Sequence, residues 1–439
     1  MYFSKYLCWF IMEVIHNGGM IMEHLAILSL LALVVTIVLG FACNKNTGIL
    51  AIAFALLLSR LAGTGDKSVI AGFSSSLFVT LFGITFLFGI AQENRTLELL
   101  AKKIVALCGK RQALLPFALF LLAAVIAAIG PGPISTSALM SVLAVSLALE
   151  LDIAPIKLLP FGSFGSFAGG LSALTPSGIV AMAQAEKAGH TDLAAPLLIC
   201  TFCAMLLYCL VLYFFVFKWH KYTPDPDKKL TGSTEKFNRD QLITLAGIGI
   251  MAALTLVFEI NVGLAAFAVG AVLSLLGVAS EEKAIKSVSL GSLIMICGVG
   301  MLIEQMLALG GIQLLSDTLS RFTTPKLAAA TMTLLGGVLS WFSSASGVVM
   351  PTLIPTVPGI AAAVGANEVG MIIGICIGAH AAATSPLSSC GAMSLAAFSS
   401  MTGADEQQRS KMFARLFYIS IGGVAFVTVL GGLGLYGLL

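Results

Sequence analysis

Long apolar segments separated by short polar ones run through almost the whole chain. Many of them approach the length of about 20 residues that a helix needs to cross a bilayer. The pattern predicts an all-α, polytopic membrane protein rather than a soluble domain. We expect full spans at 25–41, 48–62, 68–90, 193–217, 242–258, 261–279, 288–310 and 412–438.

Four further apolar segments are interrupted near their middle by glycine, proline, serine and threonine. Residues 112–149 contain Gly-Pro-Gly-Pro, and residues 326–363 contain Ser-Ser-Ala-Ser-Gly followed by three prolines. Such residues end a helix. Broken backbone at membrane depth persists only where protein buries it or where it lines a wet cavity. We therefore expect a re-entrant hairpin in each of these two segments, and interrupted helices at 158–183 and 369–400.

The two halves of the chain share the order of these parts and some of their sequence. When 46–62 is aligned with 261–277, seven of the 17 positions are identical, where composition alone gives about two. A slightly smaller shift aligns the two interrupted helices, with Gly165 opposite Gly378. When its interrupted helix is counted as a span, each half has five spans and one hairpin. Because five is odd, the second half enters the membrane from the opposite side, which predicts inverted repeats.

The chain therefore divides into two repeats and two connecting parts. The polar, proline-containing segment between the halves is a linker, and the amphipathic segments at 96–111 and 311–322 suit helices at the membrane interface. We assign no function to residues 1–19. The predicted parts are an N-terminal extension at 1–24, a first repeat at 25–217, a cytoplasmic linker at 218–240 and a second repeat at 241–439.

Composition and charge agree with this division. The chain is 58% hydrophobic and only 10% charged, whereas soluble domains are about 25% charged. When the linker is placed in the cytoplasm, 18 of the 24 Lys and Arg residues fall inside and five outside, with Lys5 unassigned. The positive-inside rule then predicts an inner-membrane protein with both termini external. The nine scattered cysteines do not suggest a disulfide framework.

The interrupted segments carry the candidate binding residues. Hydroxyls and helix N-termini suit a carboxylate, whereas freed carbonyls and hydroxyls suit a hard cation such as Na⁺. Small residues can also serve tight helix packing alone, but four clusters at repeat-matched positions favour a site. We expect substrate contacts from Ser135, Thr136, Ser172, Ser343, Ser344, Ser346, His380 and Ser385. We expect cation contacts from Gly130, Gly132, Thr175, Gly347 and Thr384.

Two ionisable residues lie within or near predicted spans. His380 is in the second interrupted helix, where it could bind a substrate carboxylate or titrate during transport. A neutral histidine bonded to a carbonyl is the alternative. Its counterpart in the first repeat is Phe167, so it breaks the symmetry of the site. Glu304 lies near the end of a span, where either a coupling role or simple placement at the interface would explain it.

Several stretches of the first half resemble a known family. These are NTGILAIAFALLLSRLAG, GFSSSLFVTLFGITFLFGIAQENRTLELLA, AAIGPGPIS and GSFAGGLS, all within residues 25–180. They are similar to the N-terminal domain of the MatC-type dicarboxylate (malonate) carriers, which belong to the ion transporter superfamily with the divalent anion/sodium symporters. The resemblance implies two hairpins and two unwound helices around a carboxylate site, an elevator-type movement and a homodimer. The chain departs from the symporters in lacking the asparagines of their Ser-Asn-Thr hairpin tips, and Phe167 replaces a polar residue.

These observations predict a secondary active transporter of small carboxylates, in particular dicarboxylates such as malonate or succinate, coupled to Na⁺ or H⁺. An antiporter or exporter of another organic anion, a membrane-embedded enzyme and a channel are the alternatives. The sequence has no H-E-x-x-H, no G-x-S-x-G and no paired intramembrane carboxylates. We therefore expect no catalytic residue, no metal, no resident cofactor and no nucleic-acid partner. The substrate's chain length, the coupling ion and the direction of transport stay open.

The charge count generates a labelling prediction. Cysteines introduced at positions 65 and 230 should react with a membrane-impermeant thiol reagent from opposite sides of the membrane, because the first lies in a predicted external loop and the second in the predicted cytoplasmic linker. Labelling in intact cells and after permeabilisation measures this. Reaction of both positions from outside would contradict the predicted topology.

Overall fold

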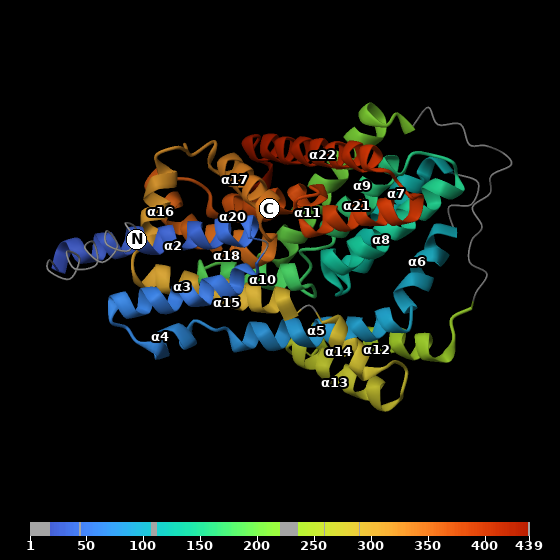
Figure 1. Cartoon of the computed structure of the whole chain (residues 1–439), viewed down its shortest axis with the longest axis horizontal. Helices are drawn as coiled ribbons and strands as arrows, with labels where there is room; N and C mark the ends of the chain where they lie inside the picture. The colour runs from blue at the N-terminus through green and yellow to red at the C-terminus, as the bar shows by residue number, and fades with distance from the viewer. Residues whose placement is uncertain are drawn as a thin grey trace.

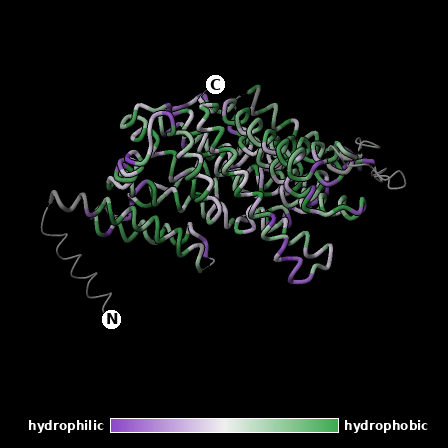
Figure 2. The backbone as a smooth tube through the Cα atoms, turned by 90° about the horizontal axis from the view of Figure 1, so that it is seen from above, coloured by the Kyte–Doolittle hydropathy of each residue, from purple (hydrophilic) through white to green (hydrophobic). Residues whose placement is uncertain are grey.

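The computed structural model describes residues 18–43, 45–106, 112–219, 236–258, 260–288 and 290–437. Within these ranges the chain is helical and has no strand, which confirms the all-α prediction. Hydrophobic residues follow most of the helices along their length (Figure 2). Six helices of the described part are long and apolar enough to cross a membrane: Ser75–Glu93, Gly132–Glu150, Ala194–Val216, Leu290–Ala308, Ala345–Val364 and Glu406–Gly432.

One group of helices, which we call the frame, comes from the first part of each half. α3 packs against α15, and α5 packs against α13; in Figure 1 most of this group lies in the lower part of the molecule. The frame consists of α2 (Gly18–Ala42), α3 (Thr47–Ala62), α4 (Asp66–Ala71), α5 (Ser75–Glu93), α12 (Arg239–Leu256), α13 (Val262–Leu275), α14 (Glu281–Ser287) and α15 (Leu290–Ala308). The amphipathic helices α6 (Thr96–Ala106) and α16 (Gly311–Ser320) follow α5 and α15.

Glycines let the frame helices touch backbone to backbone. A Cβ atom on Gly48 of α3 would collide with the carbonyl oxygen of Ile294, and one on Gly298 of α15 would collide with the backbone of Gly48. The same arrangement joins α13 and α5, where Cβ atoms on Gly263 and Gly83 would collide with the facing backbone. The two crossings are counterparts, because the alignment of 46–62 with 261–277 places Gly48 opposite Gly263 and, continued, Gly83 opposite Gly298.

Two asparagines fix the starts of the helices in these crossings. Asn46 caps α3 by accepting a hydrogen bond from the N–H of Gly48 at 2.9 Å, and its Nδ2 donates to the carbonyl of Gly291 at 2.7 Å. Asn261 caps α13 in the same way and hydrogen-bonds the hydroxyl of Thr80 on α5 at 3.1 Å. Each asparagine therefore satisfies a helix terminus and binds the opposing helix at once.

The second group, the core, comes from the later part of each half and lies mostly in the upper part of Figure 1. α7 packs on α9, α17 packs on α20 and α22, and α8 packs on α21. The core consists of α7 (Leu115–Ala128), α8 (Gly132–Glu150), α9 (Leu159–Ala168), α10 (Pro176–Lys187), α11 (Ala194–Val211), α17 (Ala328–Phe342), α18 (Met350–Leu353), α19 (Val357–Val364), α20 (Glu368–Ala381), α21 (Ser389–Thr402) and α22 (Glu406–Gly432).

The helices α9 and α20 form the centre of the core. Every residue of α9 is buried, and so is every residue of α20 from Gly370 onward. Glycine again permits the closest approach. A Cβ atom on Gly165 would collide with the carbonyl of Phe120 on α7, and one on Gly378 would collide with that of Thr333 on α17. These contacts are also counterparts, because the shift that places Gly165 opposite Gly378 places Phe120 opposite Thr333.

Some helix bounds differ from the predicted ones. The expected span at 68–90 is two helices, because α4 ends at Ala71 and the hydroxyl of Ser74 caps α5. α22 begins at Glu406 rather than near residue 412, because Asp405 and Gln408 form a capping box at its start. α2 begins at Gly18, within the predicted extension at 1–24. Residues 1–17 of that extension, and residues 220–235 of the predicted linker, lie outside the described residues.

The glycine crossings generate a stability prediction. Gly48→Ala should lower the free energy of unfolding by roughly 1–3 kcal/mol, because the added methyl group meets the backbone of α15. Gly300→Ala is the matched control, since a Cβ atom there has nothing within 4 Å, and it should be neutral or slightly stabilising. Thermal melting of the detergent-solubilised variants measures both. Equal melting temperatures would mean that the crossing tolerates a side chain.

Candidate functional site

The turn between α7 and α8 contains two glycines with positive φ, at 146° for Gly130 and 74° for Gly132. Residues with a Cβ atom rarely adopt this backbone conformation. A Cβ atom on Gly130 would collide with the ring of Phe88 on α5, and one on Gly132 would lie 2.9 Å from Cδ of Pro176 at the start of α10. The tip of the first hairpin is therefore held between a frame helix and a core helix.

The corresponding turn after α17 is built by serines. Ser343 is extended, with φ of −147° and ψ of 178°, and its hydroxyl donates to the carbonyl of Leu339 at 2.8 Å. Ser344 caps the helical run Ala345–Val364 by accepting a hydrogen bond from the N–H of Gly347 at 3.0 Å. The serine-rich sequence thus ends one helix and starts the next within two residues.

The break between α9 and α10 depends on two hydroxyl groups. Thr175 caps α10, since its Oγ1 accepts from the N–H of Gly178 at 3.1 Å and donates to the carbonyl of Gly170 at 2.6 Å. The hydroxyl of Ser172 accepts from the N–H of Leu174 at 3.3 Å. Both side chains are buried. They satisfy backbone groups that the interruption of the helix leaves without intrahelical partners.

The break between α20 and α21 repeats this arrangement in the second half. Ser388 caps α21 by accepting from the N–H of Gly391 at 3.5 Å, and its hydroxyl donates to the carbonyl of Ser385 at 2.7 Å. The hydroxyl of Ser385 accepts from the N–H of Leu387 at 3.2 Å, as Ser172 does from Leu174. Serine and threonine therefore shape both breaks.

The starts of four core helices converge on one cavity of about 300 Å³, which we call the tip cavity. Helix N-termini present free N–H groups and carry about half a positive charge each. The cavity is lined by Pro133 and Ile134 of α8, Ser177 of α10, Ser344–Ser346 at the start of the run 345–364, and Ser388–Cys390 at the start of α21. Gly40, Thr47, Phe167, Met295, Ser340, Phe342, Ser343, Ala379, His380 and Leu387 complete it.

The lining of the tip cavity has no aspartate, glutamate, lysine or arginine side chain. Its polarity comes from hydroxyl groups, one imidazole and helix N-termini. This combination attracts an anion without binding it as a tight ion pair, because the positive field comes from backbone dipoles. A carboxylate can accept several charge-assisted hydrogen bonds from such donors.

His380 occupies a central place in this lining. It lies in the last turn of α20 and its side chain is fully buried. Its ring packs edge-on against Phe167, with 5.0 Å between centroids and 67° between planes. The backbone of Phe167 is also close, but neither ring nitrogen has a hydrogen bond of ordinary distance and angle. A buried polar group without a partner costs about 1–3 kcal/mol, which makes His380 a candidate to contact a molecule in the cavity.

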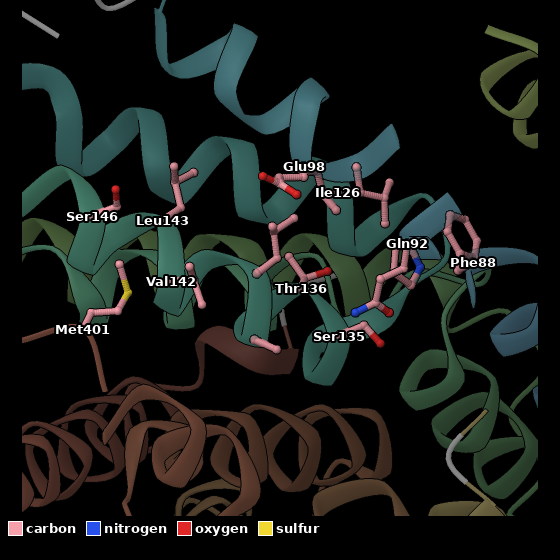
Figure 3. Close-up of a pocket in the computed structure, with 14 residues that line it drawn as sticks. Phe88, Gln92, Glu98, Ile126, Ser135, Thr136, Val142, Leu143, Ser146 and Met401 are labelled. Atoms are coloured by element: carbon pink, nitrogen blue, oxygen red, sulfur yellow. The ribbon is translucent and has the colours of Figure 1, made fainter. Parts of the chain in front are cut away.

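The predicted site residues fall into three groups. Ser343, Ser344, Ser346 and His380 line the tip cavity. Ser135 and Thr136 line a second cavity of about 500 Å³ between α8 and the helices α5 and α6, which we call the α5–α8 cavity (Figure 3). The remaining ones line neither cavity: Gly130, Gly132, Ser172, Thr175, Gly347, Thr384 and Ser385. Of these, Thr384 has a buried hydroxyl without a hydrogen-bond partner among the described residues.

The α5–α8 cavity has a different chemical character. Its walls are largely apolar, with Val142, Leu143 and Ile126 among them, and Gln92 and Glu98 face the same hollow as Ser135 and Thr136 (Figure 3). A carboxylate side chain repels an anion. This larger cavity is therefore the poorer candidate for a carboxylate site.

The sequence interpretation missed several residues of the tip cavity. Ser177, Ser388, Ser389 and Cys390 line it from the first turns of α10 and α21. A helix-start pattern was present in the sequence, since Thr175 and Ser388 are each followed three residues later by glycine. The frame residues that face the cavity have no such local pattern, because only tertiary packing brings them there.

Glu304 lies away from the tip cavity and makes an ion pair with Lys187. Glu304 is on the frame helix α15, whereas Lys187 ends the core helix α10. Both side chains are at least one-third exposed. Their position places the pair on the boundary between the frame and the core.

Among solved structures, 23 chains match this one. One is the YdaH transporter of Alcanivorax borkumensis, whose structure is described as having an unusual topology. It aligns with a TM-score of 0.59 and 13% sequence identity over 84% of this chain and 87% of that one. At this identity the likeness concerns the fold alone. No curated protein matches the sequence.

Residues 22–170 match the family described as the N-terminus of the dicarboxylate carrier protein MatC. The matched part contains the first frame helices, the hairpin of α7 and α8, and α9 up to the break before α10. It includes the stretches that carried the resemblance in the sequence, apart from the last two residues of GSFAGGLS. The resemblance of this chain to the MatC-type dicarboxylate carriers is therefore confirmed over residues 22–170.

Proposed function

We propose that the protein is a secondary active transporter of small carboxylates and that a dicarboxylate such as malonate or succinate binds in the tip cavity. The observation that carries this proposal is the convergence of four helix N-termini on a cavity whose lining holds no charged side chain. Helix N-termini and hydroxyls are donors, and an ionised carboxylate is an acceptor only. The match to a dicarboxylate carrier family supports the same substrate class.

The size of the cavity agrees with a small substrate. Its volume of about 300 Å³ lies at the lower end of the range for small-molecule sites. Two carboxylates need several charge-assisted hydrogen bonds, each contributing about 1.5–3 kcal/mol. Donors from four different helix starts can supply them from several directions.

We further propose that the two halves are inverted repeats with re-entrant hairpins at α7–α8 and at 328–364. Two alignments relate the halves, one of 46–62 with 261–277 and one of Gly165 with Gly378. The support is that helix contacts in the first half recur at the aligned positions of the second half. The glycine crossings of the frame follow the larger shift, and the core contacts and helix breaks follow the smaller one. With the linker in the cytoplasm, both termini are external and the protein lies in the inner membrane. We also propose the homodimer that the family resemblance implies.

Transport in this proposal uses an elevator-like movement of the core against the frame, driven by Na⁺ or H⁺. Frame helices pack mainly on one another, as do core helices. The tip cavity contains residues of both groups, since Thr47 and Met295 belong to the frame. A sliding core would carry its helix starts, and the bound anion, past these frame residues. Export or exchange of an organic anion would use the same site in the other direction.

Substitution of one serine in each cavity tests the location of the substrate. Ser346→Ala should weaken succinate binding roughly ten- to a hundredfold, because it removes one charge-assisted hydrogen bond. Ser135→Ala, which changes the α5–α8 cavity instead, should leave affinity within about twofold. Isothermal titration of the purified variants measures both, with thermal melting as a control for folding. The reverse pattern would place the substrate in the α5–α8 cavity.

Cross-linking tests the movement. Lys187→Cys with Glu304→Cys joins α10 to α15, so a bifunctional thiol reagent should abolish uptake in proteoliposomes if the core moves against the frame. Glu93→Cys with Lys283→Cys is the matched control, since this exposed ion pair joins α5 to α14 within the frame. It should retain uptake after cross-linking. The unlinked double variants report the effect of losing each ion pair, and uptake that survives the 187–304 link would refute the elevator proposal.

A further inference from the structure

The tip cavity offers a dicarboxylate few sources of positive charge. Two titratable side chains line it, His380 and Cys390, and both are buried. Loss of a proton from the Cys390 thiol would add negative charge beside the anion, which is unfavourable. Gain of a proton by His380 would add positive charge where the substrate lies. Of the two groups, only the imidazole can compensate the charge of an incoming dicarboxylate.

The helices packed around His380 bring no other charge to it. α9 presents Phe167, and the first turns of α8 and α10 present Pro133 and Ser177. α21 presents Cys390, and the start of the run 345–364 presents Ser344–Ser346. On α20 itself, Glu368 lies in the first turn and pairs with His190 at 2.8 Å, at the far end from His380.

The other helices packed on α20 or facing the cavity keep their charged groups elsewhere. On α11, the hydroxyl of Tyr208 donates to the carbonyl of Ile419 at 2.7 Å. The carboxylate of Glu304 on α15 forms an ion pair with Lys187. Four charged residues of α22 lie near its start and are exposed: Glu406, Arg409, Lys411 and Arg415. None of these side chains lines the tip cavity.

The hydrogen-bonding capacity of the imidazole leads to the same conclusion. A neutral imidazole has one N–H donor and one nitrogen lone pair, whereas the protonated ring has two donors. In the described part of the chain, neither nitrogen of His380 makes a hydrogen bond of ordinary distance and angle, although the backbone of Phe167 lies close to the ring. A fully ionised dicarboxylate has acceptors only, so the lone pair of a neutral ring would face like charge. Uptake of one proton turns this repulsive contact into a second hydrogen bond.

We propose that His380 takes up one proton from solvent when a dicarboxylate enters the tip cavity, so that substrate and proton move together. The proton adds to the nitrogen lone pair, and no other covalent bond changes. This inference rests on the proposed function and assigns its coupling ion. Phe167 occupies the repeat-related position, so the proton site exists in the second half only. One proton per substrate follows from this asymmetry.

Proton uptake on binding is directly measurable. Isothermal titration of purified protein with succinate, in Na⁺-free buffers of different ionisation enthalpy at about pH 7 to 8, where the carboxyl groups of free succinate are largely ionised, gives the number of protons bound. Wild type should take up close to one proton per succinate. Its apparent dissociation constant should rise about tenfold per pH unit, because binding requires a proton that becomes scarcer.

His380→Gln keeps a donor and an acceptor but cannot titrate in this range. It should bind succinate more weakly, take up no proton and show a flat pH dependence. His190→Gln is the matched control, since His190 is paired with Glu368 outside the cavity, and it should behave as wild type. If thermal melting shows that His380→Gln does not fold, His380→Asn undergoes the same titration.

The outcomes separate this inference from the function on which it rests. Succinate binding without proton uptake in wild type overturns the inference and leaves the transporter proposal standing. Proton uptake that persists unchanged in His380→Gln also overturns it, because the proton would then sit on the substrate or on another group. Absence of binding by succinate, malonate and citrate at every pH would overturn both proposals.

Discussion

The need to satisfy the backbone of interrupted helices inside an apolar body governs the site. A helix that stops at membrane depth leaves N–H and C=O groups that neither lipid nor apolar side chains can bind. Thr175, Ser344 and Ser388 each accept a hydrogen bond from a backbone N–H three residues later. The N–H groups left over at these helix starts are what a small anion can bind. The same residues therefore make the break tolerable and shape the proposed site.

Close contact between helices depends on glycine throughout the structure. In the frame, Gly48 and Gly263 let α3 and α13 touch the backbones of α15 and α5. In the core, Gly165 and Gly378 do the same for α9 and α20. Without a large hydrophobic gain between helices in lipid, such contacts provide the dispersion energy that holds the bundle together.

His380 and Phe167 occupy corresponding positions of the two halves, at the shift that places Gly165 opposite Gly378. The two rings pack edge-on at the same cavity from repeat-related positions. Hydroxyl groups and helix starts from both halves line the cavity, and together they form a lining that is neutral and rich in hydrogen-bond donors. The imidazole adds the one basic group among the side chains that line the cavity. Under the proposal, this pair of positions separates anion binding, which both halves would provide, from proton uptake, which only the second half would perform.

Local sequence determined the elements. Proline and glycine at 130–133 and serine and glycine at 343–347 act through the conformations of their own backbones, so the interruptions were readable without a structure. Apolar length predicted the helices, and amphipathic pattern predicted α6 and α16. The repeat was visible because Asn46 and Asn261, with the glycines near them, perform the same packing in each half.

Tertiary packing decided which side chains meet. Ser172 and Ser385 were equivalent to Ser344 and Ser346 as candidates, yet their hydroxyls accept hydrogen bonds within the helix breaks and they do not line the tip cavity. Ser135 lies only two residues after Pro133 on α8, but it is on a different face of the helix. Pro133 lines the tip cavity, whereas Ser135 lines the α5–α8 cavity.

Contacts between distant segments were likewise invisible in the sequence. Glu304 binds Lys187, which is 117 positions earlier in the chain, and no local pattern connects the two. Composition and periodicity predict the conformation of each segment because that conformation depends on interactions between residues close together in the sequence. The direction in which a side chain points, and the group it meets there, depend on how helices from both halves pack together.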